Sequence, residues 1–447
     1  MNVALQHTRA EQALLDAYPS FREAVALSPW LDRQRAAGYS SFAAVGLPHR
    51  RIEEWKWTDL RRALTQAYLP LVAPAVAPSG LVDELLARAP FAGLETFRLV
   101  FVDGRFDPTR SAVPSAEGFT FATLAGFGAD VPDWVERTLG RLYGPEADPI
   151  AAMNAAFLSD GAAIHLAENA KVERPVEIVS VVTDPSVHLT TLRNVIVLEK
   201  GASLTLVETH LGVEGDHVAN AVTEVRVGEG AVFNRVKVQQ DGRKAIHLSN
   251  VHVELEAEAT LNEFAATVGA GLSRNQIFAR FNGQHAQASI GGTYLLAGRQ
   301  HCDTTLVVNH AVPECSSREL FKAVLDHQAR GVFQGKLIVE KYAQKTDAKQ
   351  QSHGLLLSET AEFDAKPELE IYADDVACGH GATAGQIDEN LVFYLMARGI
   401  PKDQAMALLV AAFAAEAFEA VVDDDLRERL SVMAEGWLIN HGDRADG

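Results

Sequence analysis

The tetrapeptide Gly-Ala-Ser-Leu (residues 201–204) returns in altered form as Gly-Ala-Val-Phe (230–233) and Glu-Ala-Thr-Leu (258–261). In each copy a small residue precedes alternating apolar positions, and the alanines of the three copies are 29 and 28 residues apart. Related elements stand at Ala170 and Ala288, 32 residues before and 29 residues after this set. A regular period with two short strands per unit is typical of a solenoid, because one coil cannot bury its apolar face alone. The repeat therefore predicts a mainly β fold, a parallel β-helix.

The period breaks after Ala288 and resumes with Ala329 and Ala361, which are 32 residues apart. We therefore expect a long insertion between the two sets of repeats. Runs rich in Val, Ile, Leu and Thr with period-two alternation, such as Val176–Val182 and Thr191–Leu198, supply the expected strands. A large β-sandwich with irregular turns is the alternative architecture.

Helix-forming segments lie on both sides of the repeats. Before them, Ala10–Ala17 and Pro29–Ala37 carry apolar residues three and four apart, and turn residues separate the two segments. We expect residues 1–155 to form an N-terminal helical or mixed domain, residues 156–387 the parallel β-helix core, and residues 388–447 a C-terminal helical domain. A chain of 447 residues has the length for about two or three domains.

Two helices are predicted near the C-terminus. Asp388 can cap a helix that runs to Arg398, Gly399 suits the position after its end, and Pro401 suits the first turn of the next helix, which continues to about Val422. The second helix has an apolar stripe made of Met406, Leu409, Val410, Phe413 and Ala417. This stripe either packs against its own domain or binds a partner.

The composition excludes several classes of partner. A formal net charge of −19 argues against nucleic acid, whose binding depends on Lys and Arg. The longest apolar run, Ala405–Ala415, has eleven residues, fewer than the roughly 18 of a membrane-spanning helix. Residues Met1–Arg9 contain no apolar stretch of the kind found in signal peptides. We therefore expect a cytoplasmic protein that binds neither nucleic acid nor a membrane.

The three cysteines, Cys302, Cys315 and Cys378, include no Cys-x-x-Cys pair, which fits a reducing compartment. Three thiols cannot supply the four ligands of a typical iron–sulfur cluster, so any cluster here needs other ligands. We expect Cys302 and Cys315 to be buried core residues, since free cysteine packs as a small apolar side chain. In a strand, His301 cannot share the face of Cys302.

The Cys378-Gly379-His380 triplet is the candidate site. In an extended chain its thiol and imidazole point to the same side, and the carboxylates of Asp374 and Asp375 are close in sequence. Such groups bind soft and borderline metals or sulfur. The alternative is a buried cysteine beside a hydrogen-bonded histidine.

Two glycine motifs do not predict nucleotide sites. Residues 331–337 look like a phosphate loop, but they are one residue short, and Leu337 stands where Ser or Thr would bind magnesium. Residues 379–384 match the dinucleotide fingerprint, yet no further βα units follow to complete that fold. The cofactor-binding residues are therefore left unassigned.

Several long sequence segments resemble the core of the SufB/SufD family. They are Ser-Arg-Glu-Leu-Phe-Lys (317–322), Arg-Gly-Val-Phe-Gln-Gly-Lys (330–336), Ala-Gln-Lys-Thr-Asp-Ala-Lys-Gln (343–350), Lys-Pro-Glu-Leu-Glu-Ile-Tyr-Ala-Asp-Asp-Val (366–376) and Cys-Gly-His-Gly-Ala-Thr-Ala-Gly-Gln-Ile-Asp (378–388). Arg-Arg-Ile-Glu-Glu-Trp-Lys-Trp-Thr-Asp-Leu (50–60) is more similar to SufD than to SufB. The resemblance covers most of the chain and is weakest at about 70–160.

This resemblance implies a right-handed parallel β-helix with helical parts at both ends. It implies a non-catalytic scaffold subunit of the SUF iron–sulfur assembly complex, paired with SufB and bound through its C-terminal helices to a SufC ATPase. It also implies reduced flavin bound by the complex, at a site that the sequence does not locate. A homodimer is the alternative assembly when SufB is absent.

The resemblance further implies that Cys378 and His380 are ligands of a nascent Fe–S cluster at the SufB interface. The chain departs from the family pattern in having Gly379 where a Ser is common and Ala377 where a basic residue is common. A nearby cation would stabilise the thiolate, so the second difference concerns the pKa of the thiol.

Two other functions remain as alternatives. A β-helix carbohydrate enzyme would need paired carboxylates, for which Glu208, Glu224, Glu254 and Glu256 are loose candidates. A purely structural subunit would tolerate Cys378→Ala without losing cluster assembly.

Overall fold

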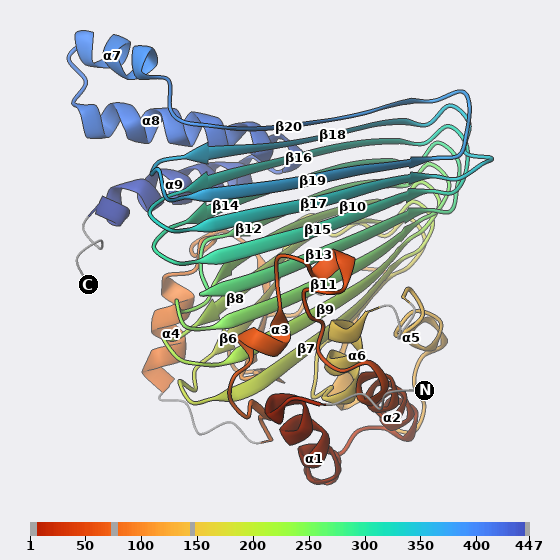
Figure 1. The fold of residues 1–447 in the computed structure, drawn as a ribbon. Helices are drawn as coiled ribbons and strands as arrows, with labels where there is room; N and C mark the ends of the chain where they lie inside the picture. Colours follow the sequence, from red (N-terminus) through yellow and green to blue (C-terminus); the bar gives the residue numbers. More distant parts are fainter. Residues whose placement is uncertain (1–6, 73–78, 144–147, 443–447) are drawn as a thin grey trace, which may run out of the picture.

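Two long β-sheets face each other and are wound by a single chain that crosses from one sheet to the other at every turn (Figure 1). The computed structural model describes residues 7–72, 79–143 and 148–442. All pairings along the solenoid are parallel, whereas the β2–β3 hairpin and the β4–β5 pair are antiparallel. The predicted parallel β-helix is confirmed, and the sandwich alternative is excluded because consecutive strands never pair within one sheet of the solenoid.

The strands have the following bounds. The first sheet, sheet A, contains β1 (Leu69–Pro70), β4 (Phe119–Thr123), β5 (Ala162–Leu166), β7 (His188–Leu198), β9 (Val218–Val227), β11 (Ile246–Leu255), β13 (Leu272–Phe281), β15 (His301–His310), β17 (Arg330–Val339) and β19 (Glu362–Ile371). The second sheet, sheet B, contains β2 (Phe97–Val102), β3 (Arg105–Phe106), β6 (Val176–Val182), β8 (Ser203–Gly212), β10 (Val232–Gln240), β12 (Thr260–Thr267), β14 (Gln287–Leu296), β16 (Ser316–Leu325), β18 (Asp347–Leu356) and β20 (Ala377–Gly385).

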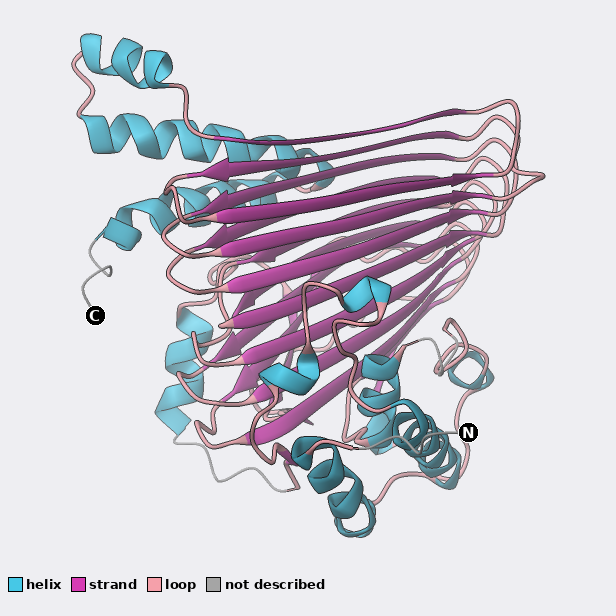
Figure 2. Cartoon of the chain, viewed as in Figure 1, coloured by secondary structure: helices cyan, strands magenta, loops and turns pink. Residues whose placement is uncertain are grey.

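Helices lie around the lower end of the solenoid and along the outer faces of its sheets (Figure 2). Those before it are α1 (Arg9–Ala24), α2 (Pro29–Val45), η1 (Glu53–Trp55), α3 (Leu60–Ala63), α4 (Ser79–Ala87), η2 (Leu124–Gly126), α5 (Asp133–Glu136) and α6 (Pro149–Ala156). Those after it are α7 (Glu389–Ala397), α8 (Lys402–Ala415), η3 (Glu416–Ala420) and α9 (Asp424–Gly442). The division into three domains stays a prediction, and strands β1 to β4, which precede residue 155, belong to the two sheets.

Caps explain where the C-terminal helices begin. The Asp388 side chain accepts a hydrogen bond from the backbone N–H of Asn390 at the start of α7, and Gly399 adopts a positive φ of 86° after its end. Pro401 is the residue that immediately precedes α8. No helix in the described part of the chain is long and apolar enough to cross a membrane, and most of Met1–Arg9 lies outside that part.

Small buried residues mark the turns between the sheets. Five of them immediately precede strands of sheet B: Ala202, Ala231, Ala259, Ala286 and Cys315. Ala329 and Ala361 do the same at the opposite edge, before β17 and β19.

The expected long insertion after Ala288 is therefore wrong. Residues 297–328 form an ordinary coil that contains β15 and β16. The alanine signal was lost there because Cys315, a small apolar side chain, occupies the turn position. The later alanines belong to turns at the other edge, so the two series are not one repeat.

The segment at residues 50–60 fastens the N-terminal helices to the outer face of sheet A. Trp55 is buried beneath the guanidinium of Arg274, which lies 4.3 Å from the ring centroid. The same guanidinium donates a hydrogen bond to the backbone oxygen of Glu54 at 2.8 Å. The Thr58 hydroxyl donates to Asp303 at 2.6 Å. The segment at residues 50–60 thus contacts a strand of sheet A that is about 220 residues away in the sequence.

Candidate functional site

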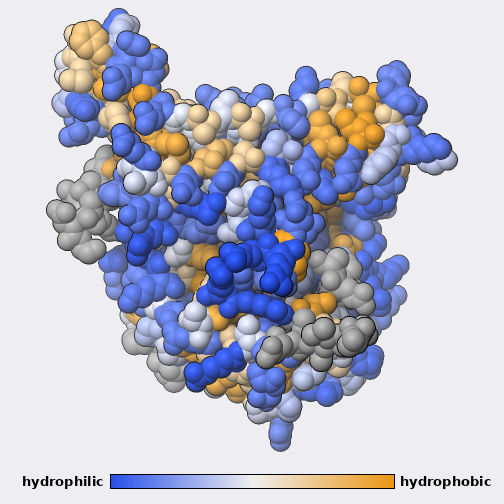
Figure 3. Space-filling model, in the orientation of Figure 1, coloured by the Kyte–Doolittle hydropathy of each residue, from blue (hydrophilic) through white to orange (hydrophobic). Residues whose placement is uncertain are grey.

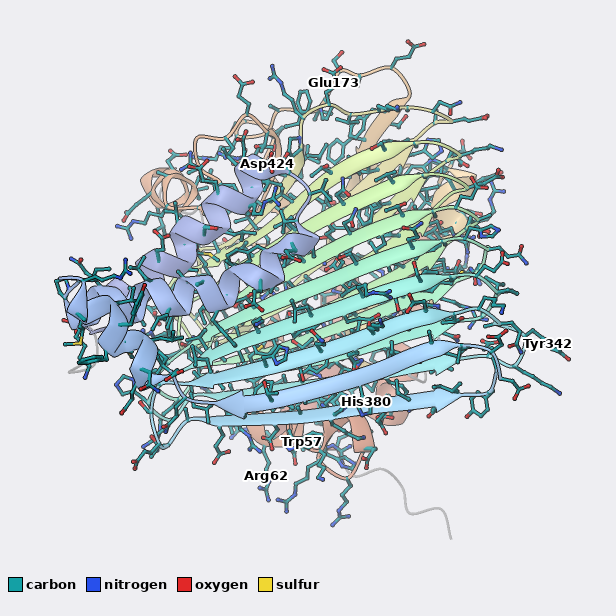
Figure 4. The ribbon with its side chains drawn as sticks, turned by 90° about the horizontal axis from the view of Figure 1, so that it is seen from above. Trp57, Arg62, Glu173, Tyr342, His380 and Asp424 are labelled. Carbon is teal, nitrogen blue, oxygen red and sulfur yellow. The ribbon has the colours of Figure 1, made fainter. Side chains whose placement is uncertain are left out.

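Cys378 and His380 lie on β20, the last strand of sheet B. They register with Ala348 and Gln350 of β18, two residues that are buried inside the solenoid. Both site residues therefore face the interior side of the sheet, and their predicted common face is confirmed. No later coil covers β20, so Cys378 is only partly buried and His380 is exposed (Figure 4).

The environment of the Cys378 thiol favours its protonated form. Burial raises the pKa of this thiol, and the negative charges of Asp347 and Glu319 raise it further. A backbone hydrogen bond from Ala348 opposes these effects but does not overcome them. Only the thiolate binds metal, so the groups of this chain that surround Cys378 do not favour its metal-binding form.

The carboxylates that were expected beside the thiol have another role. Asp375 forms an ion pair with Lys345 in the turn before β20, and its backbone N–H donates to the Gln344 side chain at 2.9 Å. Asp374 is exposed in the same turn. The carboxyl groups that act on Cys378 come instead from Asp347 and Glu319 of neighbouring strands.

The other two cysteines are core residues, as predicted. Cys302 is fully buried, and burial raises the pKa of its thiol to about 12. Cys315 is buried in its turn with its sulfur 3.3 Å from the backbone oxygen of Gly283. His301 points to the opposite face from Cys302, where its Nε2 lies 2.9 Å from the Thr58 hydroxyl.

Two donors are the most that this chain supplies at the site. Across the residues that the structure describes, no group of three or more His, Cys, Asp or Glu side chains is arranged to hold a metal ion. One thiol and one imidazole cannot complete the coordination of an iron–sulfur cluster. A cluster bound at these two residues would need its remaining ligands from elsewhere.

Glu319 and Gln350 were missed by the sequence reasoning. Glu319 of β16 registers with Gln350 of β18, which in turn registers with His380 of β20. The three residues are 31 and 30 residues apart, close to one coil, so the repeat itself could have located them. Burial raises the pKa of Glu319 to about 8.

The glycine motifs lie in strands rather than in loops. Residues 331–337 are part of β17, and residues 379–384 are part of β20. A strand cannot wrap its backbone N–H groups around a phosphate, so both motifs were rightly rejected.

Three of the four candidate carboxylates of a carbohydrate enzyme are already paired, and the fourth, Glu256, is exposed at the end of a strand. Glu208 lies 2.9 Å from Arg235, and Glu224 lies 2.5 Å from Arg193, all fully buried. Glu254 pairs with Arg226 at 3.5 Å. These partners hold the carboxylates apart from a substrate, so the arrangement does not support glycosidic chemistry.

The apolar stripe of α8 covers the chain's own sheet. Val410 and Ala417 are buried against the outer face of sheet B, and the Phe413 ring lies 4.3 Å from the Lys322 amine. Of the two roles open to the stripe, packing is the one observed. Large exposed apolar side chains occur instead on α7 and on the outer side of α8, the projection at the upper left of Figure 3: Leu391, Phe393, Tyr394, Met396 and Leu408.

Both terminal strands leave one edge free. β19 pairs only with β17, and β20 pairs only with β18. The N–H of Tyr372 donates inward to Val339, and the N–H of Ala377 donates inward to Thr346. Because successive residues of a strand alternate direction, the N–H of Ile371, which precedes Tyr372, faces the free edge of the solenoid.

A parallel solenoid whose uncovered last coil presents a thiol and an imidazole defines the class of this protein. The family model for the SUF system FeS cluster assembly SufBD core domain matches residues 181–413, and the model for the SufBD protein N-terminal region matches residues 8–178. The chain therefore belongs to the SufBD family of the SUF iron–sulfur cluster assembly system.

Its relatives extend over nearly the whole chain. The Escherichia coli iron–sulfur cluster assembly protein SufD is 28% identical over 389 residues, which are 86% of this chain and 88% of the relative. A SufBD family protein of Synechocystis is 29% identical over 416 residues, covering 90% and 89%. The chloroplastic protein ABCI7 of Arabidopsis thaliana is 24% identical over 455 residues, covering 98% and 93%.

The three thiols should react very differently with iodoacetamide. We expect one thiol, Cys378, to be alkylated in the folded chain, while Cys302 and Cys315 react only after unfolding. Because the pKa of Cys378 is raised, its labelling rate should still be increasing at a pH where that of free cysteine has levelled off. Mass spectrometry of the labelled peptides provides the measurement, with Cys378→Ser as the control. Labelling of Cys302 at a comparable rate would contradict the assignment.

Proposed function

We propose that this chain is the scaffold subunit of a SUF assembly complex, in which it pairs with SufB and recruits a SufC ATPase. In this role it supports de novo Fe–S cluster formation and iron acquisition and catalyses no reaction itself. The observation that carries the proposal is the uncovered last coil, which places Cys378 and His380 beside a free strand edge. We place this assembly in the cytoplasm.

The nascent cluster is cargo that this chain shares with its partner. Cys378 and His380 contribute at most two ligands, so SufB would contribute the others across the interface. Reduced flavin bound by the complex as a whole remains part of the proposal, without an assigned residue. Alone, the chain should be colourless because its two donors cannot retain a cluster.

The free edges of β19 and β20 suit pairing with equivalent strands of SufB. An unpaired edge exposes backbone donors and acceptors that favour pairing with another chain. In isolation the same edges could join two copies of this chain, which is the homodimer alternative.

Replacing Ile371 by Pro tests this pairing. The change removes an N–H that faces the free edge, so SufB affinity should fall about three- to tenfold, the equivalent of a net hydrogen bond of about 0.5–1.5 kcal/mol. Isothermal titration calorimetry measures the change. The matched control is Glu370→Pro, which removes an N–H directed at β17 and should instead destabilise the last coil. Unchanged SufB affinity of a folded Ile371→Pro chain would contradict the pairing.

The surface proposed for the ATPase is the exposed apolar side of α7 together with Leu408 of α8. Phe393 and Tyr394 are 73% and 53% exposed, a large apolar area for a helix that projects from the molecule. Removing residues 401–447 would be an unclear test, because Val410 and Phe418 belong to the core over sheet B.

Replacing Phe393 and Tyr394 together by Ser should reduce SufC binding by at least about tenfold while the β-helix stays folded. The expectation follows from the loss of two aromatic anchors, which dominate many interfaces. Val432→Ser on α9 is the control, since Val432 is 56% exposed but lies away from α7. Co-purification with a tagged ATPase provides the measurement, and full retention by the double variant would exclude this surface.

Cys378→Ser and His380→Ala should each reduce cluster formation by the assembled complex several-fold. Folding and assembly should change little, because His380 is exposed and Ser is close in size to the partly buried Cys378. Anaerobic reconstitution followed by iron and sulfide analysis measures the effect. Replacement of the buried Cys302 by Ala is the control and should affect stability more than cluster content. The proposal would be falsified if the isolated chain bound a stoichiometric cluster that survived the loss of Cys378.

A purely structural subunit is the competing function. It predicts that both Cys378 and His380 can be replaced without loss of cluster formation, even though the complex still requires this chain. The same reconstitution experiment therefore separates the two functions.

A further inference from the structure

Three inward-facing polar side chains form a column beneath the open end of the solenoid. Glu319, Gln350 and His380 occupy matching register positions on β16, β18 and β20. Neighbouring strands of a sheet are about 4.8 Å apart, so each side chain in the column lies next to the following one. The column leads from the interior to the candidate site.

The lower two members of this column are buried without hydrogen-bond partners. Glu319 and Gln350 are 2% and 1% exposed. Neither carboxyl oxygen of Glu319 and neither amide atom of Gln350 makes a hydrogen bond of ordinary geometry to the part of the chain that the structure describes. Each such group destabilises the fold as long as it stays unpaired. Unpaired polar groups of this kind call for an explanation, and a role at the adjacent site provides one.

The opposite wall of the solenoid leaves room for the Gln350 amide. Gly335 of β17 lies across the interior, and a Cβ atom at this glycine would be 2.3 Å from both Nε2 and Oε1 of Gln350. The missing side chain therefore accommodates an amide that would otherwise be displaced. In contrast, the same column carries the apolar Ile290 one strand below Glu319. Ile290 therefore separates the polar group near His380 from Glu263 and Arg235, which lie deeper in the same column and form an ion pair with each other.

The donors and acceptors of these side chains indicate the direction in which hydrogen bonds can run along the column. A histidine that binds metal through one ring nitrogen usually donates the N–H of the other nitrogen to an acceptor, which fixes its tautomer. A carboxamide can accept through Oε1 and donate through Nε2 at the same time. The Glu319 carboxyl group can accept from Nε2 whether or not it is protonated.

We propose that Gln350 and Glu319 are positioning residues that hold the imidazole of His380 with its outer nitrogen free to bind the nascent cluster. In the proposed arrangement Gln350 Oε1 accepts the inner ring N–H of His380 and Gln350 Nε2 donates to Glu319. These two hydrogen bonds are not formed in the structure, and reorientation of the neighbouring side chains would form them. This inference rests on the proposed function of His380 and adds two buried residues that orient its side chain.

The tautomer of His380 provides the direct test. In the full-length chain with ¹⁵N-labelled histidine, the ring-nitrogen shifts of neutral His380, assigned by loss of the signal in His380→Ala, should show one tautomer in excess of the ratio for free histidine. Gln350→Leu should return the ratio to that of free histidine. Glu319→Gln keeps an acceptor and should preserve the excess, whereas Glu319→Leu should reduce it.

Two further variants keep the test decisive. Gly335→Ala displaces the Gln350 amide without altering the column itself, so it replaces Gln350→Leu if that chain does not fold. Ser352→Ala is the matched control, because Ser352 faces the interior from β18 but registers with Ala382. In the complex with SufB, Gln350→Leu should also weaken iron binding about 10- to 100-fold, as loss of support for a metal ligand typically does.

The outcomes separate this inference from the proposed function. If His380→Ala leaves cluster formation intact, the function assigned to His380 fails. If His380 is required but Gln350→Leu and Gly335→Ala leave its tautomer ratio unchanged, the positioning role is overturned while the function stands.

Discussion

Every coil of this protein depends on the next coil for its backbone hydrogen bonds. Each inner strand of the solenoid lies between two parallel neighbours, and the register continues without a bulge from β8 to β18. A coil cannot pair its own two strands, because they belong to opposite sheets. The series therefore has to end in strands that are satisfied on one side only. The open edge of β19 and β20 is a necessary consequence of the architecture.

This constraint gives the candidate site its properties. A side chain on an inner coil that faced the interior would be buried by the next coil, as Ala348 and Gln350 are by β20. On the last coil the same direction leads to a partly covered thiol and an exposed imidazole. Cys378 and His380 thus combine an interior orientation with access from outside. Only the final coil of a solenoid permits this combination.

The sequence predicted the periodic part of the molecule better than its ends. Alternating strands and turn alanines carry a local signal, since many turns have a small buried residue directly before the next strand. The coil around Cys315 was not recognised in the sequence, because a small apolar cysteine takes the turn position that alanine occupies in other coils. The stripe on α8 was ambiguous because an apolar face looks alike whether it covers its own sheet or a partner.

The shared face of Cys378 and His380 was predictable from the extended triplet alone. The positions of Glu319 and Gln350 beside His380 could not be predicted from the triplet, because only the register of three strands brings these residues together. A proline in the sequence also marks the end of the solenoid. Pro367 stands inside β19, and proline within a strand is tolerated only at an edge, where the missing N–H faces outward.

The free edges of β19 and β20 differ in how strongly their residues favour pairing with another strand. β19 carries Pro367 flanked by Lys366 and Glu368, a composition that natural proteins use to discourage unwanted strand addition. β20 has no charged residue apart from His380 when protonated, and it contains glycines at 379, 381 and 385. A Cβ atom at any of these glycines would meet nothing within 4 Å. Glycine within a strand often marks a place where another backbone approaches closely. The edge that lacks protection is therefore the one that bears Cys378 and His380, so a strand added there would place its own side chains beside the thiol and the imidazole.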